Sequence, residues 1–187
     1  FDGRDMEGVD ESAPYSYTHN ADYSEAKAIA ERLVLSSNGP SLATVALRPH
    51  LIWGPGDTQI VPRLVARAKA GQLRRIGTKP CRVDSTYIDN AADAHLRACD
   101  ALHEKARCAG KVYFIGQPEP VVLWKWLNGL LATLGVPPVT RTLSYTTARR
   151  VGSILESGYR ILRLRAEPRM TRFLAAQLAK SHYFDHS

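Results

Sequence analysis

Tyr23 and Lys27, the ends of the stretch YSEAK, are the two residues whose types and spacing point most directly to chemistry. On a helix, side chains four positions apart lie one turn apart on the same face. A free phenol titrates near ~10, but an ammonium group one turn away favours the phenolate and lowers that pKa. Tyr23 is therefore a candidate to give a proton to a carbonyl oxygen, or to take one from an alcohol.

The spacing alone is weak support for this chemistry. A tyrosine and a lysine at positions i and i+4 often share an exposed helix face without any function, and the bare pattern favours that interpretation. The interpretation of Tyr23 therefore depends on the elements that would position it.

The hydrophobic pattern predicts strands that alternate with helices. A helix is expected from about Asn20 to Leu35, ended by Asn38, Gly39 and Pro40. Asp89 is a fitting N-cap for a helix over residues 90–106. The remaining predicted helices cover residues 60–71, 123–135, 144–165 and 170–180, and the strands cover 42–49, 73–77, 85–88 and 111–116. Residues 1–19 are loop-like.

This alternation predicts an α/β fold with a mostly parallel sheet. Good strands are few for so many helices, so we expect the later part of a doubly wound, Rossmann-like sheet that lacks its N-terminal strands. A small, mostly helical substrate-binding region accompanies it. The expected division assigns residues 1–56 and 86–116 to the remainder of the dinucleotide-binding domain, and residues 57–85 and 117–187 to the substrate-binding region.

Charge is concentrated in one segment. The chain of 187 residues has a formal net charge of +7, and residues 141–172 hold eight arginines against two glutamates. The nucleic-acid signatures of aromatic residues among lysines, or of a zinc knuckle, are lacking in the sequence. Residues 144–165 instead predict a basic amphipathic helix, for which docking on the core, contact with a membrane surface and contact with an acidic partner all remain open.

The three cysteines, Cys81, Cys99 and Cys108, are far apart and form no CxxC motif, which favours reduced thiols in the cytoplasm. His95, Cys99 and His103 share a helix face, but a row of about 12 Å is too long for one ion, so no metal site is predicted. The tryptophans at 53, 124 and 126 are expected in the core rather than in a ligand pocket.

The segments around YSEAK carry a more specific signal together. DESAPY (10–15) precedes the pair, LRPHLIWGPGD (47–57) follows it, and STYIDNAADAH (85–95) comes next. This combination resembles the extended short-chain dehydrogenase/reductase superfamily, and within it the 3β-hydroxysteroid dehydrogenase/isomerase-like branch. That branch includes sterol-4α-carboxylate 3-dehydrogenases and 2-alkyl-3-oxoalkanoate reductases. The resemblance covers nearly the whole chain.

The resemblance implies roles for individual residues. Tyr23 matches the catalytic acid/base, and Lys27 matches the lysine that lowers its pKa and holds the nicotinamide ribose of NAD or NADP. Pro49 and His50 fall where the chain passes the nicotinamide, with contacts made largely by backbone; a packed or solvated His50 imidazole is the favoured alternative. Asp89 and Asn90 match a short motif at a helix start, where a capping role is preferred.

The sequence also departs from the family pattern. Extended members open with a glycine-rich loop that binds the dinucleotide, and no such loop is present in these 187 residues. The loop and the family's catalytic Ser or Thr would lie upstream of Phe1. The chain is therefore expected to be a C-terminal fragment that is inactive alone.

The implied activity of the parent protein is NAD(P)-dependent interconversion of a secondary alcohol and a ketone. The expected substrate is small and hydrophobic, either sterol-like or a long-chain 2-alkyl-3-oxo acid. A nucleotide-sugar epimerase or dehydratase is an alternative from the same superfamily, and a non-catalytic binding protein is an alternative from another class. A homodimer and a peripheral membrane contact through residues 144–165 are further candidates.

Overall fold

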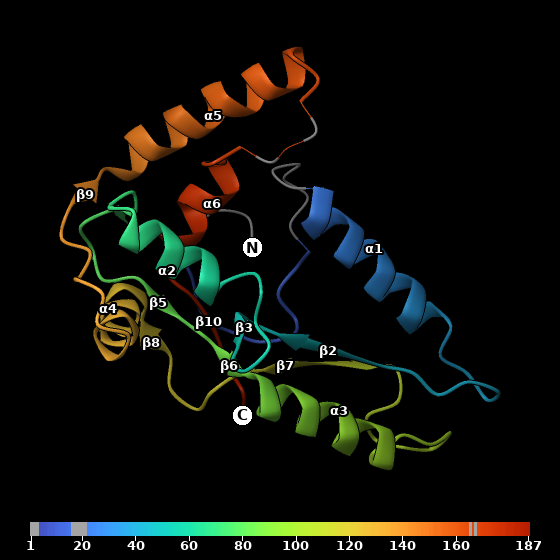
Figure 1. Ribbon diagram of the computed structural model, residues 1–187. Coiled ribbons are helices and arrows are strands. Elements are labelled where there is room, and N and C mark those ends of the chain that lie inside the picture. The colour runs from blue at the N-terminus through green and yellow to red at the C-terminus, as the bar shows by residue number, and fades with distance from the viewer. Residues whose placement is uncertain (1–3, 16–21, 165, 167) are drawn as a thin grey trace.

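The computed structural model describes residues 4–15, 22–164, 166 and 168–187. Short strands run through the middle of the molecule and helices surround them (Figure 1). The pair formed by β2 (Val45–Pro49) and β7 (Lys111–Ile115) contacts α1 (Asp22–Ser36), and α3 (Ile88–Ala101) packs against β2 as well. Figure 1 shows this pair between the two helices.

The longest strand pairing joins β2 to β7. The two strands are parallel and in register over five residues, from Val45 opposite Lys111 to Pro49 opposite Ile115. Parallel strands cannot be joined by a hairpin, and here the connection contains α2 (Val61–Lys69) and α3. Both strands were expected from their continuous apolar runs, and the structure confirms them.

The other strands are short and form three small groups. A four-stranded sheet has the order β1 (Met6–Val9), β10 (His182–Phe184), β5 (Arg82–Val83), β8 (Val121–Val122). Two further pairs join β3 (Ile52–Trp53) to β6 (Thr86–Tyr87), and β4 (Arg75–Ile76) to β9 (Thr142–Leu143). Among the described residues, five of the six ladders are parallel and only β5–β8 is antiparallel, which confirms the α/β class with a mostly parallel sheet.

The predicted helices are present with shorter bounds. The three not yet introduced are α4 (Leu123–Thr133), α5 (Tyr145–Ile161) and α6 (Arg172–Gln177). The largest difference is at the end of α3, which was expected to reach residue 106. The helix ends at Ala101 because Leu102 takes an extended backbone conformation.

Two sequence-based predictions were wrong. Residues 1–19 were expected to form a loop, but β1 lies among them and pairs with β10 from the other end of the chain. Asp89 was expected as the N-cap of α3, but Tyr87 occupies that position without a side-chain capping bond. Asp89 lies in the first turn, where its negative charge is favourable to the helix dipole.

The buried apolar side chains gather around α4. The main cluster consists of Leu73, Ile76, Trp124, Leu127, Leu131, Val136, Ala148 and Ala175. All of these residues lie within the ranges predicted for the substrate-binding region. By contrast, none of the residues of α1 whose burial is described is fully buried, and Leu33 is 63% exposed. The predicted substrate-binding region therefore has a core of its own. The division of the chain into two regions stays a prediction.

Candidate active site

Tyr23 and Lys27 lie together on the first two turns of α1. The Lys27 Nζ atom is 5.7 Å from the centroid of the Tyr23 ring, so both side chains occupy the same face of the helix. The Tyr23 side chain is 69% exposed and Lys27 is exposed as well. The pair therefore presents a phenol and an ammonium group to solvent from one surface, as the four-residue spacing predicts.

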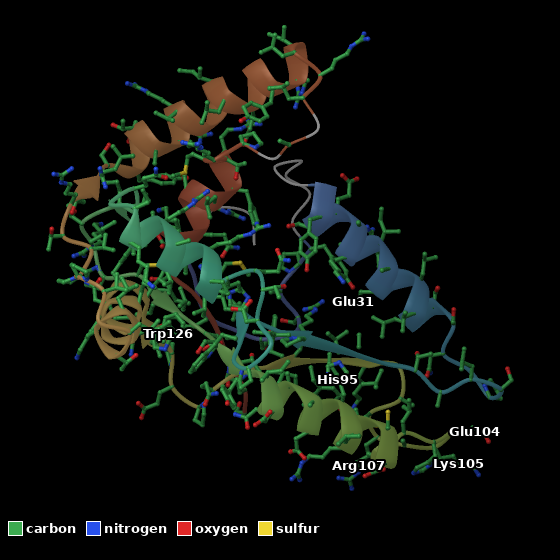
Figure 2. All side chains as sticks on the ribbon, viewed as in Figure 1. Glu31, His95, Glu104, Lys105, Arg107 and Trp126 are labelled. Atoms are coloured by element: carbon green, nitrogen blue, oxygen red, sulfur yellow. The ribbon has the colours of Figure 1, made fainter. Side chains whose placement is uncertain are left out.

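Helix α1 is held against β2 by a partly buried ion pair. Arg48 donates from Nε to Glu31 Oε2 at 2.7 Å and from Nη2 to Glu31 Oε1 at 2.6 Å. Tyr15 donates its hydroxyl to the same Oε1 at 2.6 Å. The Arg48 guanidinium holds the pKa of the Glu31 carboxyl below its usual value. Figure 2 labels Glu31, about one turn along α1 from Lys27, and this contact fixes the helix that carries the candidate pair.

The end of β2 places Pro49 and His50 beside two other strands. The His50 N–H lies 3.3 Å from both Ile115 O and Thr86 Oγ1. The Thr86 hydroxyl lies 3.0 Å from His50 O and 2.8 Å from Ile115 O, both of which are acceptors. The backbone polar groups of His50 are thus used within the fold. Its predicted contact with a nicotinamide stays a prediction.

The His50 imidazole packs inside the fold rather than into solvent. Its Nε2 lies 2.6 Å from His182 Nδ1, and His182 Nε2 lies 3.0 Å from Gln177 O. A carbonyl oxygen only accepts, so His182 Nε2 carries hydrogen and neutral His182 accepts at Nδ1. His50 therefore donates from Nε2. Phe184 completes the contact, with ring centroids 5.3 Å apart.

Burial and the neighbouring His182 lower the pKa of His50 to about 3. Burial also lowers the pKa of His182, although its bond to Gln177 acts in the opposite direction. Both imidazoles are therefore neutral near pH ~7, so His50 is poorly suited to exchange protons there. This arrangement agrees with the packed-histidine interpretation of His50.

Asp84 is a further buried polar residue close to the His50–His182 contact, and it binds β10 and the residues after it. Its Oδ2 accepts from Phe184 N at 2.8 Å and lies 2.9 Å from His186 Nε2. These contacts tie β10 to the turn after β5. Sequence reasoning missed His182, Thr86 and Asp84, because nothing in the local pattern links His50 to a residue 132 positions away.

The turn GPGD (residues 54–57) forms one wall of a cavity of about 270 Å³. Ile52, Trp53 and Ile88 supply its apolar side chains, and residues 54–60 supply the remainder. Asp57 accepts from the backbone N–H groups of Gln59, Ile60 and Val61, which fixes the start of α2. Burial raises the pKa of Asp57, but the three hydrogen bonds together lower it by more, so the pKa lies below its usual value.

Trp53 is a cavity wall as well as a packed aromatic residue. Its ring meets Tyr87 and Trp126 edge-on, with centroids 5.2 and 5.3 Å apart. Figure 2 labels Trp126 on α4. The Trp53 Nε1 is buried with no hydrogen-bond partner among the residues that the structure describes. Trp124, by contrast, is a core residue that donates to Leu178 O at 3.0 Å, as expected.

Gly54 is the position where this cavity wall is most sensitive to substitution. A Cβ atom there would lie 2.6 Å from Ile88 Cγ2, and the residue has a φ of 141°. We expect Gly54→Ala to lower the free energy of unfolding by about 2 to 4 kcal/mol. Gly56→Ala is the matched control, because Gly56 also has a positive φ, 82°, but no atom within 4 Å. Equal losses in urea unfolding of the two variants would contradict the steric argument.

The remaining sequence candidates do not form a site in the described residues. No three His, Cys, Asp or Glu side chains among them are grouped to hold a metal ion. His95 Nδ1 lies 2.7 Å from Ala91 O on its own helix, and Cys99 is exposed. His95 is labelled on α3 in Figure 2.

Solved structures of low sequence identity share the fold of this chain. A crystal structure titled gox2253 matches with a TM-score of 0.65 at 22% identity, over 96% of this chain and 52% of that one. The UDP-glucuronic acid 4-epimerase of Bacillus cereus, solved with NAD, matches with a TM-score of 0.58 at 21% identity, over 76% of this chain and 46% of that one.

The chain belongs to the 3-beta hydroxysteroid dehydrogenase/isomerase family, which matches residues 1–144. The 2-alkyl-3-oxoalkanoate reductase of Stenotrophomonas maltophilia is 53% identical over 95% of this chain and 53% of its own length. The reductase of the same name from Shewanella oneidensis is 48% identical over 100% of this chain and 50% of its own length. The decarboxylating sterol-4-alpha-carboxylate 3-dehydrogenase of Schizosaccharomyces pombe is 37% identical over 99% of this chain and 55% of its own length. The chain thus spans about half the length of these relatives.

Proposed function

We propose that the whole protein is an NAD(P)-dependent oxidoreductase that interconverts a secondary alcohol and a ketone. The observation that carries this proposal is the exposed Tyr23–Lys27 pair on one face of α1, in a chain of this family. An accessible phenol is suited to protonate a carbonyl oxygen, and an accessible ammonium group is suited to bind ribose hydroxyls. Relatives that are reductases and dehydrogenases by name support the same conclusion.

In the reductive direction, the Tyr23 hydroxyl gives its proton to the substrate oxygen as the ketone becomes an alcohol. A nicotinamide cofactor held beside Lys27 would supply the hydride for the carbonyl carbon. Lys27 stabilises the phenolate that remains on Tyr23, because its positive charge lies one helix turn away. Its ammonium group also orients the ribose. Pro49 and His50 would line the nicotinamide side of the site through the end of β2.

The two groups of relatives act, by their names, on chemically related substrates. A 2-alkyl-3-oxoalkanoate has its ketone on the carbon next to the alkylated carbon that bears the carboxylate. A sterol 4α-carboxylate likewise has its reacting C3 next to the carboxylate-bearing carbon. The shared feature is an oxygen function in the β position of a hydrophobic acid. The higher identities, 53% and 48% against 37%, favour the 2-alkyl-3-oxo acid.

Two other functions remain less supported. A nucleotide-sugar epimerase or dehydratase would share the fold, but neighbours with these names are matched at 17 to 21% identity. A non-catalytic binding protein would need no accessible phenol, whereas Tyr23 is exposed. We therefore retain the oxidoreductase as the conclusion.

A peripheral membrane contact through residues 144–165 is part of the same proposal. Helix α5 exposes Val151, Ile154 and Ile161, which are 40%, 71% and 79% accessible, and Arg150 and Arg160 are exposed on the same helix. An apolar face beside arginines suits a surface of anionic lipid. None of the helices in the described residues is long and apolar enough to cross a bilayer. Cytoplasmic location and a homodimer also remain proposals.

The proposal is tested with the complete reading frame of the parent protein. We expect NAD(P)H absorbance at ~340 nm to fall when a long-chain 2-alkyl-3-oxo acid is added, because hydride moves from the nicotinamide to the ketone carbon. A sterol 4α-carboxylate with the oxidised cofactor is the parallel assay, and a UDP-sugar is the comparison. Turnover of the UDP-sugar alone would reject the proposed substrate class.

A further inference from the structure

A second concave site lies between α5 and the start of α6, and its lining has an unusual composition. The cavity of about 370 Å³ is lined by Tyr145, Thr146, Arg149, Arg150, Ser153 and Arg172. We propose that it binds a phosphate group carried by a ligand. This inference goes beyond the proposed oxidoreductase activity and does not depend on it.

Every lining side chain carries a hydrogen-bond donor. Three are guanidinium groups and three are hydroxyl groups, and no carboxylate is among them. In the described part of the chain, neither Arg149 nor Arg150 has a hydrogen-bonding or ion-pair partner, and both are exposed. Their positive charges are therefore available to an incoming anion.

The sequence of α5 brings these donors to one face. Thr146, Arg149, Arg150 and Ser153 follow the spacing i, i+3, i+4, i+7, which places them along one side of a helix. The helix begins at a firm cap, since Ser144 Oγ accepts from Thr147 N at 3.0 Å. The start of α5, next to these donors, is therefore fixed by its own cap.

Gly152 brings the third arginine to this face. A Cβ atom at Gly152 would lie 2.7 Å from Arg172 N and from Thr171 C, so only glycine lets α6 begin this close to α5. Arg172 donates from N and Nε to the two carboxylate oxygens of Glu156, at 2.7 and 2.6 Å. This contact occupies one edge of the guanidinium and orients the rest, and for the Nη groups the described residues provide no acceptor.

The donor set fits phosphate better than carboxylate. A carboxylate has two oxygens and one charge, whereas a phosphate ester offers three oxygens and a charge of about −1.5 to −2 near pH ~7. Planar guanidinium groups bind phosphate oxygens in pairs, which gives geometry as well as charge. The arginines around a cavity bounded by small hydroxyls therefore match a phosphate group, either free in a soluble ester or exposed on a lipid.

The test is calorimetric titration of inorganic phosphate into the protein and into the double variant Arg149→Gln/Arg150→Gln. We expect the variant to raise Kd at least about tenfold, because each lost guanidinium removes charge-assisted hydrogen bonds. Lys105→Gln/Arg107→Gln is the matched control. It removes the same charge from exposed residues of the loop after α3, far from α5 in Figure 2, and should keep the wild-type Kd. Far-UV circular dichroism should be unchanged, since both mutated arginines are exposed.

Flotation with vesicles of phosphatidic acid in phosphatidylcholine distinguishes the source of the phosphate. Loss of vesicle binding in the double variant, but not in the control, identifies a lipid headgroup. Phosphate binding in solution without flotation identifies a soluble phosphate ester. The inference is overturned if wild-type protein binds neither probe, or if the double variant and its control lose binding equally.

Discussion

Replacing Tyr23 with phenylalanine should lower kcat of the full-length enzyme by about a hundred- to ten-thousandfold, because the phenol is the only proposed donor of the proton on oxygen. The dinucleotide Kd should change little. The substitution removes one hydroxyl from a side chain that is 69% exposed, and it leaves the ring beside Lys27. The measurement is NAD(P)H consumption at saturating substrate, with cofactor affinity followed separately by fluorescence.

Tyr113→Phe is the matched control. It also removes one tyrosine hydroxyl, but from a residue in β7 rather than in α1. It should retain kcat. Unchanged turnover in the Tyr23 variant would remove this residue from the mechanism. A matched fall in both variants would instead indicate a general loss of structure, which circular dichroism would detect.

Local patterns were enough to predict the elements that carry Tyr23 and Lys27. The helix over α1 and the strands β2 and β7 follow from good helix formers and from continuous apolar runs, respectively. The side-by-side placement of Tyr23 and Lys27 follows from helix geometry alone. Such features depend on residues within a few positions of one another, so sequence reasoning reaches them.

Features that depend on distant partners could not be predicted in the same way. β1 contains Glu7 and Gly8, which are poor strand formers, and the strand exists through its pairing with β10. The two-residue strands β3 and β5 have no periodicity to detect, whereas β4 and β6 lie within the runs 73–77 and 85–88 that were predicted as strands. Asp89 has the residue type of an N-cap, but the helix begins two residues earlier than that role needs.

The same limit explains the partial prediction of the candidate site. His50 was assigned to the nicotinamide side by resemblance, and packing was the favoured alternative for its imidazole. The structure shows what that packing consists of: a hydrogen bond to His182, which comes from the last strand. The consequence is a pH-dependent contact between the end of β2 and β10.

The free energy of unfolding should fall steeply in mild acid because of His50. Its pKa is about 3 in the folded state, well below the value near ~6.5 expected in the unfolded chain. Between these two values the unfolded state binds the proton more readily. The stabilisation is therefore complete above pH ~6.5 and is lost progressively as the pH falls toward ~3, by about 3 to 5 kcal/mol in all. Urea unfolding at a series of pH values measures this slope.

His50→Gln isolates the contribution of His50, because glutamine keeps an amide donor for His182 Nδ1 but does not titrate. The variant should be less stable near pH ~7 and lose most of the slope, while His182, whose pKa burial also lowers, keeps a smaller one. His103→Gln removes an exposed histidine from the loop after α3 and should leave the slope unchanged. If the His50 and His103 variants both showed the same slope as the wild type, the acid sensitivity would belong to groups other than His50.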